Sequence, residues 1–190
     1  MAAPVHFHLF DTPIGICALI WRGEVLSGAQ LPERDEDAAR ARIARRFPDA
    51  AESEPQGFVA DAVADIRALL SGEPRDLSHL PVDFAGLSAF NRRVYEIALA
   101  IPPGETMTYG EVARKLGDPG ASRAVGVALG QNPWPIVVPC HRVLASGGRT
   151  GGFSAEGGVE TKLRMLTIEK ARTSAAPSLF GALPLASRPR

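Results

Sequence analysis

Three short aliphatic runs open the chain, and their spacing differs from that of the segments that follow. The runs cover residues 5–10, 15–21 and 25–31 and are separated by the turn-forming dipeptides Thr12-Pro13 and Arg22-Gly23. Short apolar runs bounded by such turns are typical of β-strands. We therefore expect a small sheet of antiparallel type near the N-terminus.

Apolar residues then recur at helical spacing in residues 35–46, 58–70 and 88–98, which predicts three helices. Pro102 and Pro103 follow the third stripe. Proline lacks a backbone N–H and cannot continue a helix, so we expect the third helix to end before this pair.

The order of these segments predicts an α+β protein. We expect a small N-terminal α/β domain with an antiparallel-type sheet over residues 1–85 and a mostly helical C-terminal domain over residues 86–172. Residues 72–81 would connect the two. Residues 173–190 hold three prolines among mainly small or polar residues, and we expect a flexible tail there.

A helix-turn-helix is predicted early in the second domain. Thr108 stands three residues before Glu111, a capping-box pair that starts a helix, here over residues 109–116. Residues 117–120, Gly-Asp-Pro-Gly, break it, and residues 122–129 can form a second helix. Together they give a helix-turn-helix, winged-helix-like in type, although helical hairpins also occur in proteins that never touch DNA.

Composition excludes several classes. The 190 residues carry 21 Lys and Arg against 21 Asp and Glu, so overall charge does not argue for nucleic-acid binding. Residues 101–173 contain 9 basic and 6 acidic side chains, whereas residues 1–100 contain 10 basic and 15 acidic ones. This asymmetry fits a polyanion partner or chance variation on a solvated surface. No apolar run of about 18 residues occurs, so we expect neither a membrane partner nor secretion, and a cytoplasmic location.

The two cysteines, Cys17 and Cys140, are too few for a disulfide framework or a paired Cys-x-x-Cys zinc site. Cys17 lies in an apolar run, which favours a core position. A looser zinc site, with Cys17 and the histidines at positions 6, 8 and 79, is the alternative, and we expect no metal.

Cys140 is the candidate nucleophile. It follows the apolar residues 136–138 and precedes His141 and Arg142, which could supply a base or a positive environment for a thiol of pKa about 8.5. Consecutive side chains do not face one another in a regular helix or strand. Proton transfer from Cys140 to His141 would therefore need a bridging water or an unusual turn. A structural cysteine beside an incidental histidine is the competing interpretation.

The motifs around Cys140 resemble those of a known protein family. Residues 132–143, followed by 151–154 and 162–169, resemble the O6-alkylguanine-DNA alkyltransferases, also called methylated-DNA-protein-cysteine methyltransferases. Their signature is a Pro-Cys-His-Arg-Val box after an Asn-Pro-x-Pro lead. The resemblance covers roughly residues 90–169, whereas residues 1–85 resemble the family's variable N-terminal domain only in position and coarse pattern.

The resemblance implies a reaction. Cys140 would accept a methyl or other alkyl group from O6 of guanine, with O4 of thymine as a second candidate, in one irreversible turnover without metal or organic cofactor. His141 would be the water-mediated base and Glu169 its orienting carboxylate. Tyr109 would donate a proton to the leaving guanine, and Asn132 would tie the DNA-binding helix to the active-site segment.

The resemblance also implies a DNA-binding mode. A monomer would bind the minor groove of double-stranded DNA containing O6-alkylguanine, in the bacterial nucleoid if the source is bacterial, and rotate the damaged base out of the stack. Arg123 would fill the space that the base leaves. The same helix would contribute Ser122, Ala124 and Gly126 to the interface.

The base pocket would be formed by Tyr109, Val143, Phe153 and Ser154, with main-chain groups of Cys140, Val143 and Ser154 reading the base edge. The family often has tyrosine where this chain has Phe153, and the stretch to Lys162 is longer than in some relatives. Trp134, between two prolines, would either be exposed near the DNA or pack on the domain surface.

Three rival functions remain at this point. A sensor or regulator that binds alkylated DNA without transfer is one, although relatives of that kind lack the cysteine that this chain has at position 140. A cysteine hydrolase and a small DNA-binding regulator with a structural cysteine are the others.

Overall fold

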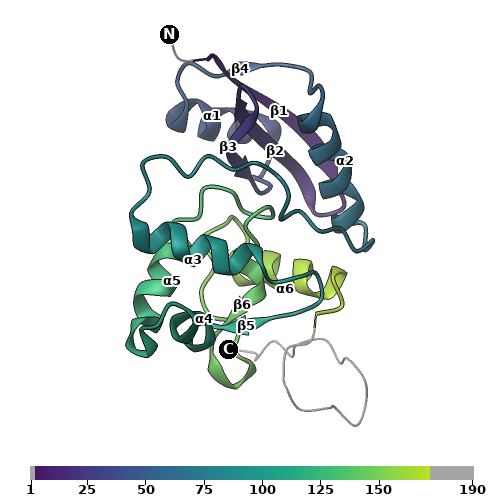
Figure 1. Ribbon diagram of the computed structural model, residues 1–190. Coiled ribbons are helices and arrows are strands. Elements are labelled where there is room, and N and C mark those ends of the chain that lie inside the picture. Colours follow the sequence, from purple (N-terminus) through teal and green to yellow (C-terminus); the bar gives the residue numbers. More distant parts are fainter. Residues whose placement is uncertain (1–2, 172–190) are drawn as a thin grey trace.

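A computed structural model describes residues 3–171, and the predicted tail at 173–190 lies outside them. Figure 1 shows a sheet flanked by helices above a mostly helical region. We call residues 3–70 the sheet half and residues 89–171 the helical half. Among residues 3–171, none of the helices combines the length and the apolar character that crossing a membrane requires.

The sheet half follows the predicted order of elements. Its strands and helices are β1 (Val5–Thr12), β2 (Gly15–Arg22), β3 (Val25–Gln30), α1 (Glu36–Arg46), β4 (Ala51–Glu52) and α2 (Phe58–Leu70). The strand order is β3-β2-β1-β4, with the first three strands antiparallel and the short β4 parallel to β1. The antiparallel-type sheet is therefore confirmed, with β4 as a parallel addition.

Both faces of β2 are buried, which explains its continuous apolar run. Side chains alternate between the faces of a strand. Ile20 packs with Ile43 of α1 on one face, whereas Cys17 and Leu19 join the main core with Ile66 of α2 on the other. The main core continues without a break into the helical half.

The helical half contains four helices and a small parallel ladder. Its elements are α3 (Ala89–Leu99), β5 (Met107–Thr108), α4 (Tyr109–Lys115), α5 (Ser122–Gly130), β6 (Val143–Leu144) and α6 (Val159–Ile168). Short 3₁₀ turns occur at Pro119–Ala121, Cys140–Arg142 and Ser146–Gly148. The helix pair α4 and α5, joined by the first of these turns, is the predicted helix-turn-helix.

The start of α4 has the predicted capping box. The Glu111 backbone N–H donates to Thr108 Oγ1 at 3.2 Å, and the Thr108 N–H donates to Glu111 Oε2 at 2.6 Å. Two N–H groups that a helix start leaves unpaired are thereby satisfied. The capping box places Tyr109 at the first position of the helix, next to β5.

Candidate active site

Cys140 begins a 3₁₀ turn, so the unusual turn considered from the sequence is present. Its backbone N–H donates to the Val138 carbonyl at 2.8 Å, and the turn continues through Arg142. The residue is 8% exposed and lines a cleft of about 740 Å³. A short turn with proline before it fixes where the sulfur lies.

Asn132 links the end of α5 to this turn. Its Nδ2 donates to the Val138 carbonyl at 2.8 Å, and its Oδ1 accepts the Trp134 backbone N–H at 3.0 Å. The Val138 carbonyl thus accepts from both Asn132 and Cys140. This linkage is the geometry expected for Asn132.

His141 and Glu169 are in contact with each other, and both side chains are buried. His141 Nε2 lies 2.9 Å from Glu169 Oε1, and the two side chains are 0% and 1% exposed. Burial alone would raise the pKa of Glu169, but its hydrogen bonds with His141 and Arg142 bring that pKa to about 2. An ionised carboxylate can only accept, so Nε2 of His141 carries the proton in this pair.

Nδ1 is therefore the ring nitrogen of His141 that can take up a proton. Burial lowers the pKa of His141 despite the opposing effect of Glu169, so the ring is neutral at pH 7. Nδ1 is buried and has no hydrogen-bond partner among residues 3–171. A neutral imidazole whose tautomer is set by a carboxylate is suited to act as a general base.

Arg142 balances the charge of Glu169 rather than that of the thiol. Its Nε and Nη2 donate to the two carboxylate oxygens of Glu169, each at 2.9 Å, and its Nη1 donates to the Ile101 carbonyl at 2.6 Å. The suggestion that Arg142 supplies the positive surroundings of Cys140 is therefore wrong, because its guanidinium is engaged in this bidentate pair.

The cation near Cys140 is Lys162. This residue is 0% exposed, and its Nζ donates to the Val143 carbonyl at 2.6 Å. Burial lowers the pKa of Lys162 to about 8. Burial also raises the pKa of the Cys140 thiol, while the Asn132 side chain and the Lys162 charge act to lower it. The resting sulfur is thus a thiol held close to groups that favour the thiolate.

Pairing of β5 with β6 brings Tyr109 into the site. Met107 pairs with Val143, so the start of α4 lies beside the turn that carries Cys140. Burial, and then the nearby Cys140, raise the pKa of Tyr109, and its hydroxyl keeps its proton. A Cβ added at Gly151 would lie 2.9 Å from the Tyr109 hydroxyl, so the glycine leaves room for the phenol.

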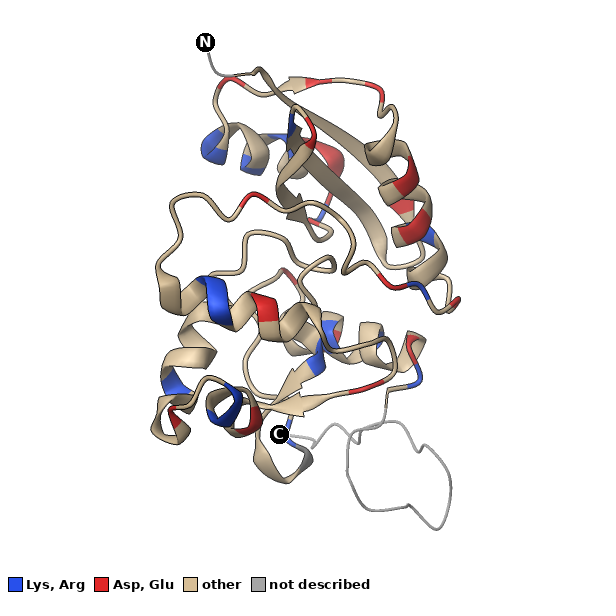
Figure 2. Cartoon of the chain, viewed as in Figure 1, with Lys and Arg blue, Asp and Glu red and all other residues tan. Residues whose placement is uncertain are grey.

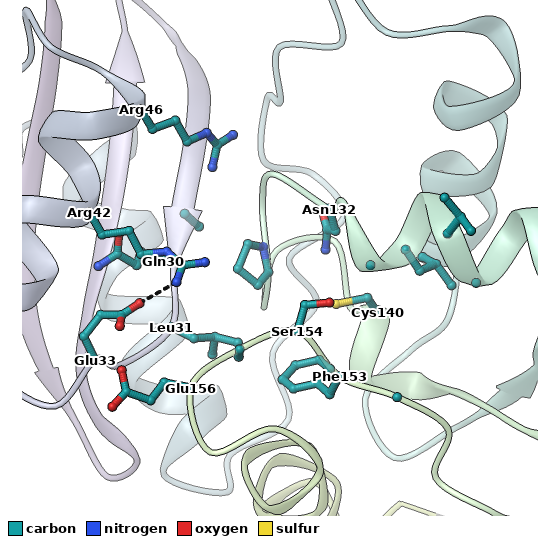
Figure 3. A pocket seen from close by; sticks show the side chains of 18 of the residues that line it. Gln30, Leu31, Glu33, Arg42, Arg46, Asn132, Cys140, Phe153, Ser154 and Glu156 are labelled. Atoms are coloured by element: carbon teal, nitrogen blue, oxygen red, sulfur yellow. Dashed lines mark ion pairs between the residues drawn. The ribbon is translucent and has the colours of Figure 1, made fainter.

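The cleft lies between the two halves (Figure 3). Eight of the predicted site residues line it: Tyr109, Ser122, Arg123, Gly126, Asn132, Cys140, Phe153 and Ser154. The buried side chains of His141, Val143 and Glu169 do not line it, and Ala124 is exposed on α5 without lining it. The opposite wall comes from β3, α1 and the loop between them, with Leu31, Arg42 and Arg46 among its residues.

Arg123 is exposed near the start of α5. Figure 2 shows basic residues on both α4 and α5, and these include Arg114, Lys115 and Arg123. The partly buried Gly126 lies next to the Tyr109 ring, since a Cβ there would be 3.9 Å from it. Glycine at this position therefore allows α4 and α5 to pack closely.

The looser zinc site is not assembled in the described part of the chain. Within residues 3–171, no group of three or more His, Cys, Asp or Glu side chains is placed to hold a metal ion. Cys17 is a core residue instead, and burial raises its pKa to about 12.

Comparisons with known proteins agree with this geometry. The family model described as 6-O-methylguanine DNA methyltransferase, DNA binding domain, matches residues 89–171. The methylated-DNA–protein-cysteine methyltransferase of Mycobacterium tuberculosis is 37% identical over 176 residues, which cover 93% of this chain and 99% of that protein.

The chain belongs to the methylated-DNA–protein-cysteine methyltransferase family.

Solved structures of relatives support the α+β fold of this methyltransferase. The crystal structure of the Mycobacterium tuberculosis O6-methylguanine methyltransferase has a TM-score of 0.70 at 37% identity, covering 93% of this chain and 99% of that chain. The Mycobacterium tuberculosis OGT in complex with DNA has a TM-score of 0.71 at 36% identity, covering 87% and 92%. The similarity thus includes the sheet half, where the sequence resemblance was only coarse.

The sequence interpretation of this methyltransferase missed Lys162 and the cleft wall from the sheet half. A lysine near the start of a surface helix usually lies in solvent. The available signal was its spacing, because Lys162, Met165 and Leu166 stand at i, i+3 and i+4 and form the buried face of α6. Of the two places expected for Trp134, exposure near the DNA is wrong, because the residue is 2% exposed.

Proposed function

We propose that the protein repairs DNA by moving an alkyl group from O6 of guanine to Cys140 Sγ, once per molecule, with O4-alkylthymine as a second candidate substrate. The observation that carries the proposal is a cysteine that lines the cleft and is followed directly by His141, whose ring is paired with the buried Glu169 carboxylate. The relatives' names and the family model support the same reaction.

In the proposed reaction, the Cys140 thiol passes its proton through water to His141 Nδ1. Glu169 stabilises the resulting imidazolium, and Lys162 stabilises the thiolate. The thiolate attacks the alkyl carbon, so that a C–S bond forms as the C–O6 bond breaks. The bonding electron pair leaves with guanine, the Tyr109 hydroxyl supplies a proton at N3, and the phenolate so formed regains a proton from solvent water.

We also propose that α4 and α5 bind the minor groove of double-stranded DNA containing O6-alkylguanine. An O6 substituent inside a duplex is out of reach of the sulfur, so the base must rotate out into the cleft. Arg123 would occupy the vacated space, with Ser122, Ala124 and Gly126 along the interface and Phe153 and Ser154 at the pocket wall. The protein would act as a cytoplasmic monomer, with residues 1–85 and 86–172 as its two domains.

Stoichiometric incubation with a duplex oligonucleotide containing O6-methylguanine tests the proposal. Peptide mass analysis should find one added methyl group on the Cys140 peptide and none in a Cys140→Ser variant. Tight binding of the lesion duplex with Cys140 left unmodified would instead support the sensor function and refute alkyl transfer.

A further inference from the structure

Trp134 connects the sheet half to the segment that presents Cys140. Its indole Nε1 donates to the Leu26 carbonyl of β3 at 2.8 Å, across 108 sequence positions. The neighbouring Pro133 carbonyl accepts the Ala29 backbone N–H at 3.0 Å and Arg46 Nη1 at 3.3 Å. Because β3 is an edge strand of the sheet, its outward backbone groups can bond to other segments, and they bond to residues 81–83 as well as to this one.

Aromatic side chains enclose the same indole. Phe84 and Tyr95 meet it edge to face, with ring centroids 5.5 Å and 6.1 Å away. The Tyr95 hydroxyl donates to the Ala128 carbonyl of α5 at 2.8 Å. The indole thus lies where β3, α3 and α5 meet, packed between these rings, and its Nε1–H is directed at β3.

A short series of hydrogen bonds runs from Trp134 to the nucleophile. The Trp134 carbonyl accepts the Val138 N–H at 2.7 Å, and the Val138 carbonyl accepts the Cys140 N–H at 2.8 Å. Displacement of Trp134 would therefore be passed to Cys140 through two hydrogen bonds.

The turn between Trp134 and Val138 is strained. Ile136 has a φ of +77° and is buried. A β-branched residue rarely adopts this left-handed conformation, and it persists only where the surroundings hold it. Through the contacts of Trp134 with β3, the sheet half can stabilise this conformation of Ile136.

We propose that Trp134 is a positioning residue for alkyl transfer: fixed by β3, it maintains the strained turn that sets the place of the Cys140 sulfur. The sheet half then takes part in the reaction through this contact, and the inference rests on the proposed function. A residue with a merely structural role would change the stability of the protein without changing the rate of transfer in the folded state.

Trp134→Phe keeps an aromatic ring but removes the hydrogen-bond donor together with part of the buried indole, so it needs a control that loosens the packing alone. The Leu26 carbonyl still accepts the Asp83 N–H at 2.9 Å, so no buried acceptor is left without a partner. A net hydrogen bond corresponds to a rate effect of up to about tenfold. The rate constant for transfer at saturating lesion DNA should fall by about that factor, while the half-saturating DNA concentration stays within about twofold of wild type.

Phe84→Leu is the matched control, since it loosens contact with the same indole but leaves the hydrogen bond to Leu26 in place. It should lower the melting temperature yet transfer at the wild-type rate. Amide hydrogen exchange in the peptide containing Val138 and Cys140 should speed up in Trp134→Phe and not in α4 or α5.

The outcomes separate cleanly. Wild-type rates in Trp134→Phe, or an equal loss of rate in Phe84→Leu, overturn the positioning role while leaving the proposed function intact. A wild-type protein whose Cys140 is never alkylated overturns both.

Discussion

His141 Nε2 and Glu169 Oε1 lie 2.9 Å apart, and Arg142 donates hydrogen bonds to both oxygens of the same carboxylate. Glu169 is therefore ionised, and it fixes both the tautomer and the orientation of the imidazole. The geometry leaves His141 Nδ1 as the proton acceptor for a sulfur in the adjacent residue.

Glu169→Gln should slow transfer and destabilise the protein. The amide can still accept from His141 but cannot offset an imidazolium, so we expect the single-turnover rate to fall by about 10²-fold. Arg142 keeps its buried charge without a carboxylate, at a cost of about 3 kcal/mol in the free energy of unfolding. Urea unfolding and transfer kinetics measure the two effects. Glu160→Gln, exposed on the first turn of the same helix, should change neither.

The transfer rate should be insensitive to mild acid. His141 must be neutral to accept a proton, and burial lowers its pKa below the ordinary value of about 6.5. Lowering the pH should therefore leave the rate unchanged down to about 6.5 and reduce it only below that value. Single-turnover assays at saturating DNA between about pH 5 and 7, where Lys162 stays charged, give the profile. A loss of rate on acidification that is already complete at about pH 6.5 would contradict the assignment of His141 as a buried neutral base.

The strands and helices could be predicted because their signals are local. The apolar runs, the capping box at Thr108 and the proline stop after α3 each depend on nearby residues. The assignment of Cys140, His141 and Glu169 to one site depended on the family motifs, because the residues around Glu169 do not indicate that its side chain is buried.

Other features depend on long-range contacts and could not be predicted. Trp134 is buried because β3, more than 100 positions earlier, supplies an acceptor for its indole. Lys162 is buried because the Val143 carbonyl and the space beside Tyr109 receive its ammonium. Neither partner can be found from the residues flanking these two positions.

Lys162→Met should separate stability from reactivity. Burial holds the pKa of Lys162 at about 8, below its unfolded value of about 10.4. Between these two pH values the unfolded chain thus binds more protons than the folded chain. The free energy of unfolding of the wild type should therefore rise as the pH rises from about 8 to 10, and fall again as the pH falls.

The methionine variant should lack that rise, because its side chain does not titrate. At neutral pH its free energy of unfolding should equal or exceed that of wild type, since the cost of burying a charge is removed. Its transfer rate should fall by about tenfold because the thiolate loses a nearby cation. Thermal unfolding at several pH values and single-turnover kinetics check the two parts, and an unchanged rate would remove Lys162 from the site.

Gly151→Ala should slow transfer through Tyr109, and Gly147→Ala provides its matched control. Both glycines have positive φ, +70° and +72°, so alanine at either position should cost about 1–2 kcal/mol of stability. Only at Gly151 would the new Cβ meet the Tyr109 hydroxyl, at 2.9 Å, whereas at Gly147 nothing lies within 4 Å. Gly151→Ala must therefore displace the phenol that we propose as the proton donor to the leaving guanine. Gly147→Ala should lose stability without losing rate, while Gly151→Ala loses at least as much stability and also transfers about tenfold more slowly. Equal transfer rates in the two variants would show that the position of Tyr109 does not limit the reaction.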